Sequence, residues 1–236
     1  MSDRPALPRP LDDVELRVLG TLIEKSLTTP DQYPLTVNST RVGCNQKTAR
    51  DPVTEFDERT VYAALGQLRQ IEFVRELSPA DSRVAKYEHR LGMKLDLRNS
   101  AVAVLGLLAL RGPQTPGELR QHGHRMHEFA DTDAVVEVLD KLCQRQPALA
   151  VNLGRAAGQR EDRYAHLLGQ KDAATWRGLL GGVLSAAPLS GGFAAPSQPV
   201  VSGLVAANTL AELRAEVEAL KARVEALEAA RSPMPD

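Results

Sequence analysis

An internal repeat constrains the fold of this chain more than any other feature of the sequence. The tripeptide Val-Leu-Gly at residues 18–20 returns at 104–106, and a Thr-Pro dipeptide downstream of it returns with the same separation. A later pattern of Arg, Tyr, His and Leu at 83–91 returns at 160–168, with a smaller separation. Two matched blocks in the same order predict two copies of one supersecondary unit, and the smaller separation predicts extra residues in the first copy.

Copy one, residues 11–92, is predicted to contain three helices and a β-hairpin. Asp57 has a side chain of the type that caps a helix, and the apolar residues after it recur at helical spacing. Pro34 suits the first turn of a helix, and a turn sequence separates two alternating runs before residue 90. The predicted helices cover residues 12–25, 34–43 and 58–70. Three helices that lead into a hairpin are typical of a winged helix-turn-helix.

Copy two, residues 93–168, repeats this order. Thr115 to Glu118 form a capping box with a proline at the first helical position. The predicted helices cover 99–111, a segment from 115, and 132–145; the predicted strands lie near 149–153 and 160–167, with a wing tip at 154–159. The fold class is therefore mainly α with small β-hairpins (α+β), organised as tandem winged helix-turn-helix domains. The surplus in copy one falls largely at residues 44–53, which we call the insert.

The two ends of the chain differ from the repeat. Residues 1–10 are predicted to be a tail, and residues 169–207 a flexible linker in which a short helix around Trp176 could dock on a domain. Residues 208–231 carry a heptad pattern that favours a parallel two-stranded coiled coil, and hence a homodimer. The alternative is a single solvated amphipathic helix. The heptad positions are Leu210, Leu213, Val217, Leu220, Val224 and Leu227.

Several motifs resemble those of the bacterial YceH-type family. They include Thr-Thr-Pro-Asp-Gln-Tyr-Pro-Leu at 28–35, Cys-Asn-Gln-Lys-Thr at 44–48, and Thr-Pro-Gly-Glu-Leu-Arg at 115–120. The resemblance covers roughly residues 11–168. It implies a tandem winged-helix fold and a heptad tail, and it implies no activity because that family is itself uncharacterised.

The sequence offers little that predicts catalysis. No nucleophile elbow, phosphate loop or paired-carboxylate motif is present, so we expect no enzyme activity and no cofactor. His122, His124 and His127 fit no common zinc spacing, and we expect no metal site. His89 and His166 hold matching positions in the two hairpins, which favours a packing role.

Cys44 lies near basic residues that could lower the pKa of its thiol, but a packed cysteine is the favoured interpretation. With two cysteines and no apolar signal or membrane-spanning run, the chain is expected in the cytoplasm, away from membranes.

Charge leaves two kinds of binding function open. The chain has a formal net charge of −1, each copy is close to neutral, and both third helices begin with acidic residues that would repel a DNA backbone. The candidate contact residues for a nucleic acid or a partner are Arg41, Lys47, Arg50, Arg59, Arg155, Arg160 and Arg163. The first hypothesis is a dimeric regulator that binds double-stranded DNA mainly through the copy-two wing arginines. The second is an adaptor that docks another protein on its winged helices.

Overall fold

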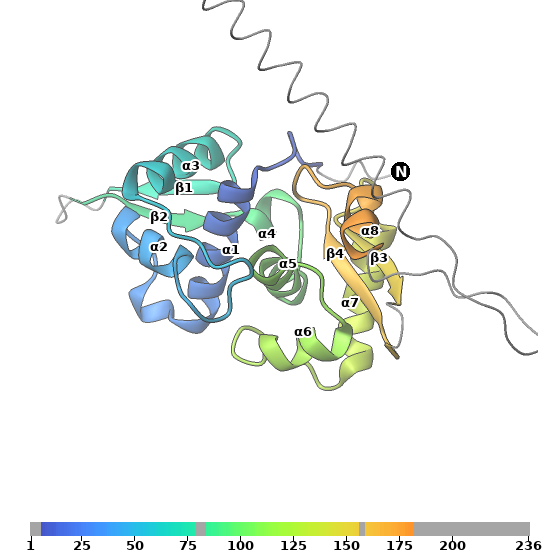
Figure 1. The fold of residues 1–236 in the computed structure, drawn as a ribbon. Helices are drawn as coiled ribbons and strands as arrows, with labels where there is room; N and C mark the ends of the chain where they lie inside the picture. The colour runs from blue at the N-terminus through green and yellow to red at the C-terminus, as the bar shows by residue number, and fades with distance from the viewer. Residues whose placement is uncertain (1–5, 79–83, 156–158, 182–236) are drawn as a thin grey trace, which may run out of the picture. The chain divides into compact units, whose positions relative to one another are not determined.

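The computed structural model describes residues 6–78, 84–155 and 159–181. Among these residues the fold has eight α-helices and two separate two-stranded antiparallel sheets (Figure 1). The predicted class, mainly α with small β-hairpins, is confirmed. The order of three helices and a hairpin occurs twice, which is consistent with a pair of winged helices. The predicted coiled coil at 208–231 lies outside the described residues.

In copy one, helix α1 spans Asp13–Thr28 and begins with a capping box. The Asp12 carboxylate accepts a hydrogen bond from the Glu15 backbone N–H (2.7 Å), and the Glu15 carboxylate accepts one from the Asp12 N–H (2.9 Å). Arg9 adds an ion pair with the buried Glu15. A short 3-10 helix, Pro30–Gln32, follows α1.

Helix α2 spans Val37–Cys44, so the prediction that Pro34 occupies its first turn is wrong. Leu35 forms two backbone hydrogen bonds with Tyr87 in the hairpin (3.1 and 2.7 Å), which holds this segment extended. The helix begins only after Thr36, whose hydroxyl accepts a hydrogen bond from the Ser39 N–H.

Helix α3 spans Glu58–Gln70, as predicted, with the Asp57 carboxylate capping the Thr60 N–H at 2.7 Å. It leads into strand β1, Val74–Leu77, which pairs with β2, Lys86–His89. The one-turn helix α4, Leu91–Lys94, connects the two copies.

Copy two begins with helix α5, Asn99–Arg111, which matches the predicted range. Helix α6, Pro116–Gly123, has the predicted capping box, and helix α7 spans Thr132–Gln144. Strands β3, Ala150–Arg155, and β4, Asp162–His166, form the second hairpin. Gln114 bonds to Tyr164 through two backbone hydrogen bonds, the counterpart of the pairing between Leu35 and Tyr87 in copy one.

The two copies pack together where α1 crosses α5, and this crossing explains the repeated tripeptide. A Cβ added at Gly20 would lie 2.9 Å from Cγ of Leu110 on α5. A Cβ added at Gly106 would lie 2.7 Å from Cγ2 of Ile23 on α1. Each glycine therefore admits a side chain of the opposite helix, and the residues around both glycines are buried.

Helix α8, Ala173–Gly181, follows copy two in the segment predicted to be a linker. The buried Trp176 packs with Leu153 and Ala165 of the second hairpin. Its indole N–H donates to the His166 carbonyl at 3.0 Å. The start of α8 is therefore attached to copy two, whereas Leu179 is exposed. Among the helices described, none is long and apolar enough to cross a membrane.

Candidate nucleic-acid interface

The exposed face of α3 is small, polar and nearly free of net charge. Arg59, Tyr62, Ala63 and Gln67 are exposed along it, and Tyr62 is 60% exposed. A Cβ added at Gly66 would meet no atom within 4 Å. No packing contact inside the described chain therefore explains a glycine at this position. Glycine in a helix lowers stability by about 0.5–1 kcal/mol relative to alanine. Such a face allows a close approach from outside.

Helix α7 is the counterpart of α3 and has the same length, which allows a comparison position by position. The caps correspond, because Asp131 accepts a hydrogen bond from the Ala134 N–H as Asp57 does from Thr60. The buried positions also correspond: Val61, Leu65 and Leu68 in α3 match Val135, Leu139 and Leu142 in α7.

The exposed positions of the two helices do not correspond. Where α3 has Arg59, Ala63 and Gly66, α7 has Asp133, Glu137 and Asp140. Lys141 offsets one of these acids through an ion pair with Glu137. Because phosphates repel carboxylates, the acids of α7 oppose contact with a DNA backbone, and α3 has no acid at the matching positions.

Of the two acids at the start of α3, Asp57 has a structural role, whereas Glu58 is exposed. The Asp57 carboxylate caps the Thr60 N–H, and hydrogen bonding to the side chain and then to the backbone of Thr60 lowers the pKa of this carboxyl. Asp57 therefore has a structural reason for its position. Its charge is offset locally by the N-terminal end of the helix dipole.

The three wing arginines of copy two differ in their surroundings. Arg163 donates to both carboxylate oxygens of Glu118 (3.0 and 3.1 Å) and to the Pro113 carbonyl (2.9 Å), so it braces the start of α6. Arg155 forms an ion pair with Asp162 at 3.1 Å. Arg160 is exposed and has no hydrogen bond or ion pair with another described residue. The wing thus presents fewer unengaged cations than the sequence suggests.

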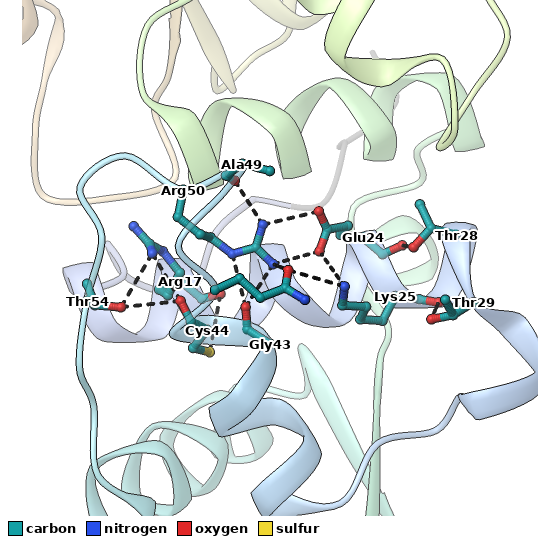
Figure 2. A network of polar contacts seen from close by, with 11 residues as sticks. Arg17, Glu24, Lys25, Thr28, Thr29, Gly43, Cys44, Ala49, Arg50 and Thr54 are labelled. Atoms are coloured by element: carbon teal, nitrogen blue, oxygen red, sulfur yellow. Dashed lines mark hydrogen bonds and ion pairs between the residues drawn. The ribbon is translucent and has the colours of Figure 1, made fainter.

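Arg50, one of the candidate contact residues predicted from the sequence, is buried and is therefore not available for contact at the surface. Figure 2 shows its guanidinium between α1 and the end of α2. Arg50 donates to both Glu24 carboxylate oxygens (3.1 and 2.6 Å) and to the Gly43 carbonyl (3.1 and 2.9 Å). Burial alone would raise the pKa of the Glu24 carboxyl, but the bonds and charge of Arg50 outweigh it and hold this pKa below its ordinary value.

A second buried arginine fixes the rest of the insert. Arg17 of α1 donates to the Cys44 carbonyl at 3.2 Å (Figure 2) and to the Pro52 carbonyl at 2.6 Å. Cys44 itself is fully buried, and burial raises the pKa of its thiol. The packed interpretation of Cys44 therefore fits, and a reactive thiolate does not.

The remaining basic candidates lie at the surface. Lys47 is exposed and has no ion pair with another described residue. Arg41 is partly exposed and donates to the Asn38 side chain at 2.8 Å, and Arg59 is exposed on α3. The structure does not gather the seven basic candidates into one site. Sequence reasoning also missed Tyr62, although its spacing of three residues from Arg59 places both on one helical face.

The histidines have separate local partners. Nδ1 of His122 lies 2.8 Å from the Gln114 side-chain oxygen, Nδ1 of His124 lies 3.0 Å from the Gln121 carbonyl, and His127 meets Phe129 edge-on. In the described part of the chain, no three His, Cys, Asp or Glu side chains form a group able to hold a metal ion.

The matched histidines of the two hairpins are packed against neighbouring elements. His89 Nε2 lies 2.9 Å from the Ser26 hydroxyl, and His166 meets Trp176 edge-on. Burial lowers the pKa of each imidazole to about 4.

Comparison with known proteins places these features in a family context. The family model described as "Protein of unknown function, DUF480" matches residues 11–159. A UPF0502 protein of Xanthomonas campestris pv. campestris (strain B100) is 49% identical over 222 residues, which cover 93% of this chain and 97% of that protein. A UPF0502 protein of Azoarcus sp. (strain BH72) is 44% identical over 233 residues, covering 98% and 96%. A third, from Leptothrix cholodnii, is 43% identical over 219 residues, covering 92% and 90%.

Proposed function

The chain belongs to the DUF480 family, and we propose that it is a tandem winged-helix protein that binds double-stranded DNA through helix α3 of copy one. The UPF0502 names of its relatives specify no activity, whereas the geometry of the two copies supports DNA contact by α3. In a winged helix the third helix enters the major groove. Helix α3 holds that position in copy one, and α7 holds it in copy two.

The observation that carries the proposal is the contrast between these two helices. They share their caps and their buried positions, yet acids in α7 stand where α3 has Arg59, Ala63 and Gly66. Within α3, Tyr62 and Gln67 can contact base edges and sugars, and the small residues allow the helix backbone to approach them. We therefore assign groove contact to copy one alone.

Copy two supports this assignment in a different way. Its helix α5 packs against α1, so it holds the first helix of copy one in place. Its acidic α7 face points to a role other than phosphate contact. Of the wing arginines, Arg160 is the best placed to add a backbone contact, because Arg163 is engaged with Glu118.

Fluorescence anisotropy with a labelled random-sequence duplex tests the proposal on the full chain. Arg59→Ala should weaken binding and flatten the log–log salt dependence by about 0.9, the slope expected for one phosphate contact. Tyr62→Ala should weaken binding with little change in slope, because a tyrosine carries no charge. The matched control is Lys141→Ala, which removes an exposed cation from α7 and should leave binding unchanged.

Two results would count against the proposal. Binding that survives both α3 variants but is lost in Arg155→Ala with Arg160→Ala would move the contact to the copy-two wing. Negligible duplex binding even at low salt would favour the second candidate, a protein-interaction adaptor. The exposed Tyr62 is the observation that fits such an adaptor, because tyrosine is enriched at protein interfaces.

A further inference from the structure

A cavity of about 610 Å³ lies between the two copies, away from the candidate residues of α3. We propose that it binds a small phosphorylated molecule of about mononucleotide size. The walls come from the end of α1, the insert, α5, and the end of α6 with the turn after it. This volume is within the usual range of about 300–1,000 Å³ for small-molecule sites. The inference does not rest on the proposed DNA binding.

Positive charge is concentrated in this cavity. Its cationic lining residues are Lys25, Lys47, Arg111 and Arg125. The described lining also contributes the acidic residue Glu24, whose carboxylate pairs with the buried Arg50 (2.6 Å) and with Lys25 (3.2 Å). Lys47, Arg111 and Arg125 form no ion pair with another described residue. In a chain with a formal net charge of −1, such a group of cations is suited to a multiply charged anion.

The cavity also has an apolar floor and further polar groups. Leu107, Leu110 and Met126 line it and are all buried. His122 lines it too, with its Nδ1 directed to the Gln114 side-chain oxygen. The Gln114 amide nitrogen donates to the Leu107 carbonyl, which fixes the oxygen as the partner of a protonated Nδ1. Nε2 of His122 is thereby the ring atom left for a ligand. Cations above an apolar floor fit a phosphate ester with an apolar or aromatic part.

The insert forms one wall of the cavity, and copy two has no equivalent of this segment. Gln46, Lys47, Thr48 and Ala49 line the cavity. The Arg50 guanidinium, which is bound to Glu24, also donates to the Ala49 carbonyl (2.8 Å) and to the Gln46 side chain (3.1 Å). Ala49 has a positive φ of 60°, which is costly for a residue with a Cβ. The buried arginine therefore holds an unfavourable loop conformation that places Lys47 at the cavity.

The shape of the site favours a small molecule over a DNA backbone. Side chains from four segments surround the space, and its floor consists of buried residues. Small-molecule sites are concave in this way, and they occur preferentially between domains. A ligand here would contact Lys47 from copy one and Arg111 or Arg125 from copy two, and so would connect the copies.

Isothermal titration calorimetry of the full chain tests the proposal with three probes: ADP, pyrophosphate and adenosine. ADP should bind once per chain, pyrophosphate more weakly, and adenosine weakest, since the charge and the apolar part both contribute. Lys47→Ala combined with Arg125→Ala should weaken ADP binding at least about tenfold, because it removes two charge-assisted contacts. The matched control is Arg98→Ala combined with Lys141→Ala, which removes two exposed cations outside the cavity and should change nothing.

The proposal fails if neither ADP nor pyrophosphate binds, or if the cavity variant binds ADP as well as the wild type does. A response to pyrophosphate without one to ADP would contradict the proposed ligand size. A random-sequence duplex that displaces ADP would show that the phosphates recognised here belong to DNA. Thermal unfolding of both double variants shows whether each is folded, so that a loss of binding can be read as a loss of contacts.

Discussion

Arg50 determines the conformation of the insert in copy one. Its side chain is completely buried, and its partners come from α1, the end of α2 and the insert itself. A buried cation of this kind is tolerated because a carboxylate and several carbonyls surround it. The consequence is that Arg50 and Lys47, three residues apart and alike in charge, have opposite roles.

Arg50→Ala should destabilise the protein by about 3–5 kcal/mol, because the Glu24 carboxylate would lose its buried partner. Lys47→Ala should change the free energy of unfolding by no more than about 0.5 kcal/mol, as exposed substitutions usually do. Urea unfolding of the two variants measures both. Equal, small effects would mean that Arg50 is not buried in solution.

The lowered pKa values of the two packed histidines should make the protein less stable in acid. Burial lowers the pKa of His89 and His166 to about 4, whereas an unfolded histidine titrates near 6.5. Between these values the unfolded state binds more protons, so stability falls as pH decreases, by up to about 1.4 kcal/mol per pH unit for each histidine. Urea midpoints measured across this pH window should show the slope, and His89→Gln should reduce it. A slope that His89→Gln leaves unchanged would contradict this account.

At the scale of elements, the crossing of α1 and α5 couples the two copies. Gly20 and Gly106 each accept a side chain of the opposite helix, so the same tripeptide in both copies serves one interface. Helix α3 contains a glycine that accepts no side chain of another helix. Gly66 has open space around it, and nothing inside the described chain requires it.

Alanine substitutions at Gly106 and Gly66 should have opposite effects on stability. Gly106→Ala should destabilise the fold by about 1–3 kcal/mol, because its Cβ would meet Ile23 at 2.7 Å. Gly66→Ala should stabilise the protein by about 0.5–1 kcal/mol, since alanine is the better helix former and no clash opposes it. Thermal unfolding gives both values. A stabilising Gly106→Ala would show that α1 and α5 do not pack this closely.

The sequence predicted the elements better than the surroundings of single side chains. The caps and apolar spacing of α3 and α5 are local signals, and those helices have the predicted bounds. The start of α2 could not be found locally, because Leu35 is held extended by Tyr87 far along the chain. Burial of Arg50 likewise depends on Glu24, which lies in another helix. The cavity between the copies needed the complete fold.

At the scale of the whole molecule, the prediction of a homodimer rests on the heptads at 208–231, outside the described residues. Residues Met1–Ala187 form a compact unit. A chain ending at Ala187 should therefore stay folded and sediment as a monomer, while the full chain should sediment as a dimer. Analytical ultracentrifugation at tens of micromolar, a generous concentration for a specific dimer, makes the comparison. A monomeric full chain would contradict the coiled coil, and a dimeric short chain would move the interface into the compact unit.

The two copies share one architecture but differ in what they expose. Matching caps and cores maintain the third helix in each copy, while acids replace the small and basic residues of α3 on the face of α7. This difference between otherwise equivalent helices is the basis for assigning DNA contact to copy one. It also suggests that the two exposed faces can be altered without disturbing either core.

Exchanging the exposed faces tests that assignment most directly. One variant places the α7 acids on α3, with Arg59→Asp, Ala63→Glu and Gly66→Asp; the other removes them from α7, with Asp133→Arg, Glu137→Ala and Asp140→Gly. Duplex affinity is measured by fluorescence anisotropy for both variants and the wild type, after circular dichroism has shown that each is folded. Our account predicts that the α3 variant loses duplex binding at every salt concentration, while the α7 variant binds at least as well as the wild type. An α3 variant that binds like the wild type would contradict it.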